Sequence, residues 1–313
     1  MAYRLEILPR DEKDSEKKKK QTVKNPKGCV VLVHGICHGA WCWENFINFF
    51  AEHSYQCYAV SLRGHGNSDG REHLKDFGLS DYVEDVKIAV ETCREETGMK
   101  PFLIGHSMGG AVVQKYIGEY EDTVQGAILF APATAPKMTL GDVFPKNRNL
   151  LFATFIAWDC CGVFSKFGVK REKIVQDAAF FSSKDKRSKI TQRVKDASRF
   201  GALLQAESKK VTGGAIKIGE LRKCYTKNYD VHIPVFVIGS YADLYFPEES
   251  LMKTADKYSQ NGKTALVVLE RLCHDMMLDD DEWKASAIPV LRFMENPVQF
   301  ADAKENHWPR EKL

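Results

Sequence analysis

The sequence predicts an α/β fold in which a mostly parallel sheet is covered by helices on both faces. Between residues 29 and 130, short apolar runs of strand length alternate with longer stretches of helical periodicity, as in repeated strand-helix units. The apolar runs are continuous, which is typical of strands buried on both faces. A G-x-S-x-G pentapeptide at 105–109 lies between one such run and a helical stretch.

The expected elements follow one another along the chain. Residues 3–8 are a candidate edge strand, and the charge-dense run 9–20 is typical of a solvated loop or hairpin. The core then predicts strands over 29–33, 56–60, 102–104 and 127–130 and helices over 41–53, 80–97 and 110–119. Two further strands, 234–238 and 264–269, follow a long interval and complete the sheet.

Two of these helices have clear apolar periodicity. In 80–97 one apolar face is formed by Tyr82, Val86, Ala89, Val90 and Cys93. In 110–119 the apolar side chains recur at helical spacing, at Val112, Val113, Tyr116 and Ile117.

Ser107 is the candidate nucleophile. It lies where the strand 102–104 meets the helix 110–119, and a serine at such a corner sits in a strained turn with its hydroxyl presented to a ligand. Gly105 and Gly109 allow the strand and the helix to approach without a Cβ clash. Because a serine hydroxyl is a weak nucleophile, this motif predicts a general base, an orienting acid and oxyanion donors.

Asp243 and His274 are the candidate partners of Ser107. Each follows the carboxyl end of a predicted strand, where ligands bind in open α/β sheets. His274 is expected to take the proton of Ser107, and Asp243 to orient the imidazole. His106 cannot fold back onto its neighbour with good geometry, so a structural role is expected for it.

Three other aspartates are less suitable than Asp243. Asp275 and Asp279 are too near His274 in sequence to reach its ring easily, and Asp230 precedes its strand.

The backbone N–H groups of Ile36 and Met108 are the expected oxyanion donors. Met108 follows the nucleophile, and Ile36 lies in the glycine-containing loop that follows the strand 29–33.

His34 and His38 in this loop are a weak metal-ligand pattern, and His34 is expected to support the loop instead. No metal site and no cofactor are expected, because the sequence has neither a C-x-x-C spacing nor a phosphate-binding G-x-x-x-x-G-K-[ST] motif.

Together these residues resemble the α/β-hydrolase family of serine hydrolases. The similar segments are 33–35, 63–68 and 105–109, with Asp243 and His274 in the family's order, and the resemblance covers roughly 28–131 and 232–294. It implies an α/β-hydrolase core over 1–131 and 232–313 and a Ser107, Asp243 and His274 triad.

Two branches of the family are indicated by different segments. Residues 34–41 are similar to plant methyl esterases and hydroxynitrile lyases, whereas 63–68 are similar to monoacylglycerol lipases, lysophospholipases and cofactor-free haloperoxidases. The lyases carry threonine at the place of Gly35 and lysine at the place of Asp275. The resemblance therefore favours ester hydrolysis over cyanohydrin chemistry.

The interval 132–231 predicts a helical cap inserted after the strand 127–130. It is far longer than an ordinary connection, so it is expected to carry structure of its own. Within it, 187–204 is expected to form a helix with one apolar face, formed by Ile190, Val194, Ala197 and Gly201. A cap of this kind excludes water and shapes a pocket.

The composition of this interval bears on the substrate. Twelve of the fifteen residues at 150–164 are apolar, too few for a bilayer span of about 20 residues. They favour the core of the cap, an acyl-chain tunnel or an interfacial surface.

Residues 134–232 carry twenty Lys or Arg and nine Asp or Glu, so anionic amphipathic substrates and peripheral contact with an anionic membrane are expected alternatives to a merely solvated face. The four lysines at 17–20 are a second candidate for lipid contact. No nucleic-acid partner is expected, because no recognition motif accompanies the charge.

The nine cysteines indicate a reducing compartment. Their number is odd, several lie in apolar strand or helix patterns, and no apolar run near residue 1 resembles a signal peptide. A cytoplasmic location, with or without peripheral membrane contact, is the expectation.

Three functions remain open at this point. The first is a serine hydrolase acting on a monoacyl lipid or another medium-to-long acyl ester through an acyl-enzyme. The second is a ligand-binding or sensing protein on a hydrolase scaffold. The third is cofactor-free haloperoxidase-like perhydrolysis, which would use the same residues.

Overall fold

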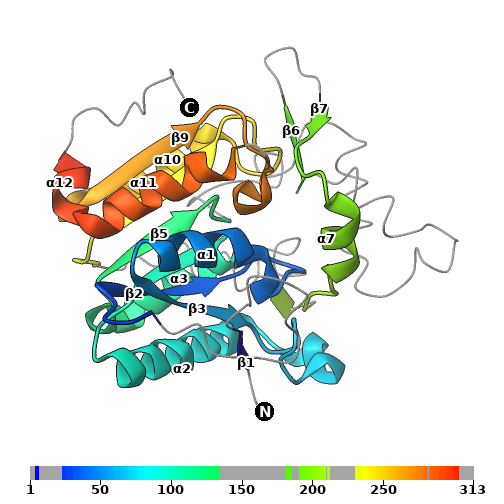
Figure 1. The fold of residues 1–313 in the computed structure, drawn as a ribbon, viewed down its shortest axis with the longest axis horizontal. Helices are drawn as coiled ribbons and strands as arrows, with labels where there is room; N and C mark the ends of the chain where they lie inside the picture. The colour runs from blue at the N-terminus through cyan, green and yellow to red at the C-terminus, as the bar shows by residue number, and fades with distance from the viewer. Residues whose placement is uncertain are drawn as a thin grey trace, which may run out of the picture.

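The computed structural model describes residues 4–6, 23–133, 181–184, 190–208, 210–211, 230–280 and 282–302 (Figure 1). The strands are β1 (Arg4–Glu6), β2 (Gly28–Val33), β3 (Tyr55–Ser61), β4 (Phe102–His106), β5 (Gly126–Phe130), β6 (Ser182–Lys184), β7 (Ile190–Gln192), β8 (Val235–Ser240) and β9 (Thr264–Leu269). The α-helices are α1 (Glu44–Glu52), α2 (Leu79–Thr97), α3 (Met108–Tyr120), α7 (Ala197–Leu203), α10 (Glu248–Tyr258), α11 (Trp283–Glu295) and α12 (Pro297–Asp302). The short 3-10 helices are η2 (Ala40–Trp43), η3 (Arg71–Asp76), η4 (Glu121–Thr123), η6 (Ser259–Asn261) and η7 (Met276–Leu278).

The main sheet has seven strands in the order β1-β3-β2-β4-β5-β8-β9. All neighbours pair in parallel except β1, which pairs antiparallel with β3 at the edge. The chain runs outward from β2 to β3 and then returns to place β4 on the other side of β2. Beyond the carboxyl ends of β2 and β4 lies the point where the strand order reverses, which is the usual ligand-binding position in open α/β sheets.

Alternate side chains of the central strands enter two separate hydrophobic cores. On β2, Val30 and Leu32 belong to one core, and Val31 and Val33 belong to the other. Every residue of this strand is buried. The continuous apolar run therefore reflects burial on both faces of a parallel sheet.

Helices on each face supply the rest of these cores. The first core contains apolar residues of α1 and α11, such as Phe46, Phe50 and Phe293. The second contains apolar residues of α2, α3 and α10, such as Val86 and Val112. The sheet is thus the middle layer of three, which confirms the predicted fold class.

The predicted strands and helices of the core match the observed ones to within a few residues. The largest difference at a helix start concerns 41–53, where η2 precedes α1, so the α-helix begins only at Glu44. The predicted edge strand over 3–8 is observed in part as β1.

The expectation for 187–204 is wrong in its first half. Residues Ile190–Gln192 form β7, which pairs antiparallel with β6, and only Ala197–Leu203 is helical. The spacing of the apolar residues cannot distinguish one continuous helix from a strand followed by a short helix. Most of the predicted cap, including the apolar run 150–164, lies outside the described residues, as do the lysines at 17–20.

Candidate active site

Ser107 occupies a strained turn between β4 and α3. Its backbone has φ 52° and ψ −118°, a conformation that is costly for a residue with a side chain. Hydrogen bonds hold the turn on both sides, since Ser107 N–H donates to Phe130 O (3.0 Å) and Gly110 N–H donates to Ser107 O (2.9 Å). The residue is 5% exposed. The backbone therefore has the strained strand-to-helix turn that the motif predicts.

The glycines of the motif are required by close backbone contacts. A Cβ at Gly105 would lie 2.3 Å from Gly109 O, and a Cβ at Gly109 would lie 2.5 Å from the carbonyl oxygens of Val33 and His34. Only glycine permits these approaches. As a result, the start of α3 packs directly against the end of β2.

The structure brings Asp243 and His274 together. His274 Nδ1–H donates to Asp243 Oδ2 over 2.8 Å, and both side chains are 1% exposed. The other carboxylate oxygen accepts the N–H groups of Tyr245 (2.7 Å) and Phe246 (3.3 Å), which hold the acid in place. The rings of these two aromatic residues also lie against the imidazole. Of the two ring nitrogens of His274, Nδ1 is therefore the one that faces Asp243.

The neighbouring candidates have other partners. His106 Nε2–H donates to His274 O (3.2 Å), so this histidine supports the loop that carries His274. Asp275 pairs with His38, and Asp279 accepts two bonds from Arg193.

Asp230 also lies away from His274. It is 96% exposed at the surface. The preference for Asp243 over all three of the other aspartates is thus consistent with the observed contacts.

Ile36 and Met108 lie in the two segments that meet at Ser107. Met108 is the first residue of α3, where backbone N–H groups point out of the helix. Ile36 belongs to the loop 34–39 after β2, which is called the oxyanion loop below. A Cβ at Gly35 would lie 3.0 Å from the Cβ of Ser107 and 2.9 Å from His106 Nδ1, so this loop is pressed against the elbow.

His34 supports the oxyanion loop, as expected. Its Nδ1–H donates to Gly35 O (2.7 Å), and its Nε2 accepts Leu62 N–H (3.1 Å), which is the pattern of a neutral imidazole. Burial lowers the pKa of His34 to about 3. Burial also lowers the pKa of His106 well below its usual value, so both rings are uncharged at neutral pH.

His38 and Asp275 form a fully buried ion pair beside the candidate triad. Burial lowers the pKa of His38, but Asp275 at 2.8 Å outweighs it and the net pKa is raised. The second ring nitrogen, Nδ1, donates to Ile36 O (2.6 Å). A protonated His38 therefore holds the carbonyl of the residue expected to supply an oxyanion donor.

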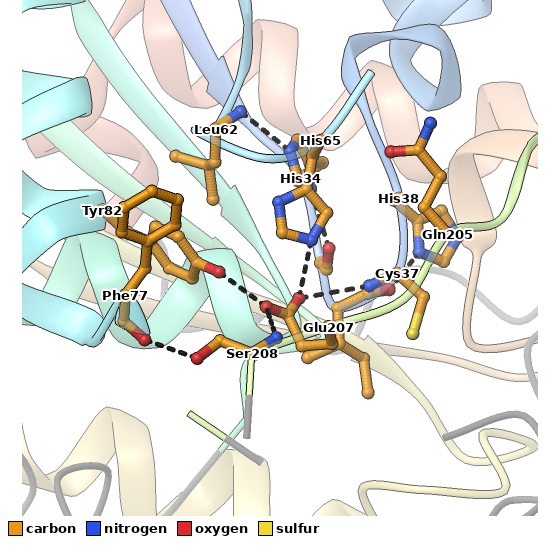
Figure 2. A network of polar contacts seen from close by, with 12 residues as sticks. His34, Cys37, His38, Leu62, His65, Phe77, Tyr82, Gln205, Glu207 and Ser208 are labelled. Atoms are coloured by element: carbon orange, nitrogen blue, oxygen red, sulfur yellow. Dashed lines mark hydrogen bonds and ion pairs between the residues drawn. The ribbon is translucent and has the colours of Figure 1, made fainter. Parts of the chain in front are cut away.

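His65 and Glu207 form a second buried ion pair, with Nε2 3.1 Å from Oε2 (Figure 2). His65 lies in the motif 63–68, whereas Glu207 lies in the insertion between β5 and β8. The sequence reasoning assigned neither residue a role. The two are 142 positions apart, and nothing in the sequence indicates their pairing.

Among the described residues, His106, His274 and Asp275 form a group whose ligand atoms lie within 4.8 Å of one another. The contacts given above already account for the group, since His106 bonds the backbone of His274 and approaches Asp275 (3.5 Å). His274 uses its Nδ1 on Asp243. These residues therefore form a hydrogen-bonded cluster of the candidate active site.

The described cysteines are all free thiols, and they are Cys29, Cys37, Cys42, Cys57, Cys93 and Cys273. In the part of the chain that the structure describes, no helix combines the length and the apolar character needed to cross a membrane.

A family described as serine aminopeptidase, S33, matches residues 24–281. The chain belongs to this α/β-hydrolase family. The match extends from before β2 to just before α11 and so includes all of the candidate site residues.

Several relatives match over about a third of the chain. A monoacylglycerol lipase from Mycolicibacterium smegmatis is 36% identical over 111 residues, which are 35% of this chain and 39% of the relative. Methyl jasmonate esterase 1 from Vitis vinifera is 30% identical over 115 residues, which are 36% of this chain and 43% of the relative. The chain thus spans about two fifths of the length of these relatives. Both branches indicated by the motifs are represented.

Solved structures with the same fold cover most of the chain. A monoacylglycerol lipase from Paleococcus ferrophilus has a TM-score of 0.60 at 19% identity and covers 88% of this chain and 96% of its own. An esterase from Exiguobacterium antarcticum has a TM-score of 0.62 at 18% identity and covers 87% of this chain and 93% of its own. At these identities the likeness concerns the fold.

Proposed function

We propose that this protein is a serine hydrolase that cleaves carboxylic esters through an acyl-enzyme. The observation that carries the proposal is the combination of Ser107 in a strained elbow with a buried, hydrogen-bonded His274 and Asp243 pair. Ester hydrolases among the relatives support the same class of reaction.

The proposed reaction begins with proton transfer from Ser107 to His274 Nε2. The Ser107 oxygen attacks the ester carbonyl carbon, and the developing oxyanion accepts the N–H groups of Ile36 and Met108. Asp243 stabilises the imidazolium through Nδ1–H. The C–O bond of the ester then breaks, and His274 returns its proton to the leaving alcohol.

Water completes the cycle. His274 removes a proton from a water molecule that attacks the acyl-enzyme carbonyl, and the same oxyanion donors stabilise the second tetrahedral intermediate. The Ser107 oxygen leaves with the proton held by His274, which releases the carboxylic acid. No redox step and no external cofactor enter this sequence.

A medium-to-long acyl ester, such as a monoacyl lipid, is the proposed substrate class. This part of the proposal is supported by the apolar composition of 150–164 and by the name of the lipase relative. Within the described residues, Phe200 of α7 stacks on Trp41 near the oxyanion loop (ring centroids 5.7 Å apart). The insertion thus packs a buried aromatic side chain against Trp41, which lies just after the oxyanion loop. Peripheral contact with an anionic membrane and a cytoplasmic location remain predictions.

The test is a series of nitrophenyl esters from two to sixteen carbons, assayed with the wild type and with Ser107→Ala. Rates that rise toward long chains and disappear in the variant would support the full proposal. Activity confined to short esters would support the methyl-esterase branch and reject the acyl-length part.

Two other functions would be revealed by the same preparation. A folded wild type that hydrolyses no ester, but binds candidate ligands equally well with and without the Ser107 hydroxyl, would be a binding protein. Peracid formation from a carboxylic acid and hydrogen peroxide, at rates above those of ester hydrolysis, would indicate a perhydrolase. This class is suggested by a relative, a non-heme chloroperoxidase from Streptomyces lividans that is 32% identical over 121 residues.

A further inference from the structure

Glu207 is a fully buried carboxylate that belongs to the insertion but lies among residues of the core. Its Oε1 accepts the hydroxyl of Tyr82 (2.6 Å) and the N–H of Ser208 (2.7 Å). Its Oε2 lies 3.1 Å from Nε2 of His65 and accepts Cys37 N–H over 3.3 Å. One side chain therefore connects the oxyanion loop, the motif 63–68 and α2 (Figure 2).

The carboxylate is charged in the folded protein. Burial raises the pKa of Glu207, but His65, Tyr82 and Ser208 together lower it to about 2. His65 donates with both ring nitrogens, to Glu207 and to Arg63 O (3.2 Å), so it is an imidazolium. A charged acceptor makes the bond from Cys37 N–H stronger than a neutral acceptor would.

Cys37 needs external support because its backbone is strained. Its φ is +64°, in the left-handed region that residues with a side chain rarely adopt. Such a conformation persists where the surroundings over-determine it. Here the insertion holds both sides of the residue, since Glu207 accepts Cys37 N–H and Gln205 N–H donates to Cys37 O (2.8 Å).

The peptide group between Ile36 and Cys37 is held at both ends by buried ion pairs. Its carbonyl accepts His38 Nδ1–H, and His38 is paired with Asp275. Its N–H donates to Glu207, which is paired with His65. This peptide shares the Cα of Ile36 with the preceding peptide, which carries the expected donor N–H, so holding it restricts the positions that this N–H can take.

We propose that Glu207 is a positioning residue for the oxyanion site and that the insertion thereby completes the active site of the core. The inference rests on the ester hydrolysis proposed above. The hydrogen bond from His38 to the carbonyl of this peptide lies within the core. The hydrogen bond from its N–H to Glu207 forms only when the segment 204–208 is docked on the core. Catalysis should therefore depend on that docking even though Glu207 touches no substrate.

The test compares Glu207→Gln and Glu207→Ala in the full chain. The amide retains an oxygen that can accept Cys37 N–H but loses the charge, whereas alanine loses both. We expect kcat to fall about 10-fold in the first and about 100-fold in the second with KM little changed, as for a misplaced catalytic group. The matched control is Ser208→Ala, which removes the hydroxyl bond of the same segment to Phe77 O and leaves the bonds to the oxyanion loop in place.

A transition-state analogue separates positioning from simple loss of folded protein. A trifluoromethyl ketone bearing the preferred acyl chain forms an oxyanion on the enzyme, so its Ki should rise by the factor by which kcat/KM falls. Ki does not depend on the fraction of active enzyme, which fluorophosphonate titration measures separately. Equal Ki and kcat for the wild type and both Glu207 variants would overturn the inference while leaving ester hydrolysis intact.

The two proposals can fail separately. If the wild type hydrolyses no ester, the rate of fluorophosphonate labelling at Ser107 still reports the oxyanion donors, and an unchanged rate in Glu207→Ala would reject the positioning role. If the wild type neither hydrolyses esters nor reacts with fluorophosphonate, both proposals are wrong.

Discussion

At the scale of single residues, the candidate site depends on two backbone conformations that are unfavourable in isolation. Ser107 and Cys37 both have positive φ, and each is held by hydrogen bonds from segments distant in sequence. Strain of this kind costs about 1–3 kcal/mol per residue and is found where function requires it. The two strained residues lie on the loops that carry the proposed nucleophile and the proposed Ile36 donor.

Gly109→Ala tests the close contact between these loops. The added Cβ would lie 2.5 Å from two backbone carbonyl oxygens, so α3 must move away from the end of β2. We expect a loss of about 1–3 kcal/mol in the free energy of unfolding and a fall in kcat of about 100-fold. Urea unfolding and ester hydrolysis measure the two effects.

Gly98→Ala is the matched control for this substitution. Gly98 also has a constrained backbone (φ +70°), but nothing lies within 4 Å of its Cβ position at the end of α2. It should lose about 1–2 kcal/mol of stability for its left-handed conformation and keep the wild-type kcat. A variant at Gly109 that behaves like this control would show that the contact has no catalytic importance.

At the scale of the elements, the candidate catalytic residues and a group of stabilising aromatic residues lie at opposite ends of the parallel strands. The candidate residues follow the carboxyl ends of β2, β4, β8 and β9, whereas Phe102 and Phe236, near the starts of β4 and β8, pack on α11. Phe293 of α11 is fully buried against Phe236 and Phe102, which stand near the starts of β8 and β4 (ring centroids 5.2 and 6.2 Å away). These contacts lie at the end of the sheet remote from Ser107.

Phe293→Ala should therefore affect stability without affecting the chemistry. Removing a buried phenyl ring costs about 3–5 kcal/mol, which denaturant unfolding would measure. At a temperature where the variant is fully folded, kcat/KM should equal that of the wild type. A selective loss of kcat in the folded variant would indicate that the packing of Phe293 on Phe236 and Phe102 also positions the carboxyl ends of the strands.

At the scale of the whole molecule, two ion pairs with buried carboxylates connect the insertion to the core. Glu207 pairs with His65, and Arg193 pairs with Asp279 (3.0 Å), whose carboxylate is also fully buried. Both pairs connect segments that are far apart in the chain. Docking of the insertion should consequently depend on pH.

The direction of this dependence follows from the two pKa shifts at the His65 pair. Glu207 ionises at about 4.5 in an unfolded chain and at about 2 in the folded protein, so its stabilisation is present above about pH 4.5 and is lost as the pH falls toward 2. The pKa of His65 is raised above 6.5, so its contribution is complete below pH 6.5 and is lost as the pH rises through the raised value. Stability from this pair should be greatest between about pH 4.5 and 6.5.

Thermal unfolding from pH 2.5 to 9 should show this profile in the wild type. In Glu207→Gln, the loss of stability between pH 4.5 and 2 should be shallower, because the folded protein no longer holds that ionised carboxylate. Parallel profiles for the two proteins across the acid range would contradict the assignment of a charged pair.

The sequence predicted the core well because its signals are local. Continuous apolar runs mark strands buried on both faces, and the spacing of Gly105, Ser107 and Gly109 marks one specific turn. The order of Ser107, Asp243 and His274 identified side chains of which the last two are hydrogen-bonded. Each of these signals lies within a few residues or follows from the order of the strands.

The contacts of the insertion could not be predicted in the same way. Glu207 is one acid among many charged residues, and its partners at 37, 65 and 82 are set by tertiary packing. The apolar spacing of 187–204 also suited a helix, although β7 and α7 divide it. Periodicity predicts which residues are buried but does not specify which element buries them.

The most direct test of the central claim is to locate the reactive residue. The native protein would be treated with a fluorophosphonate, digested and analysed by mass spectrometry, alongside Ser107→Ala and the heat-denatured wild type. Our account predicts one adduct per chain on the peptide that contains Ser107, no adduct in either control, and slower labelling in Asp243→Asn. An adduct on a different residue, or a native protein that does not react, would contradict it.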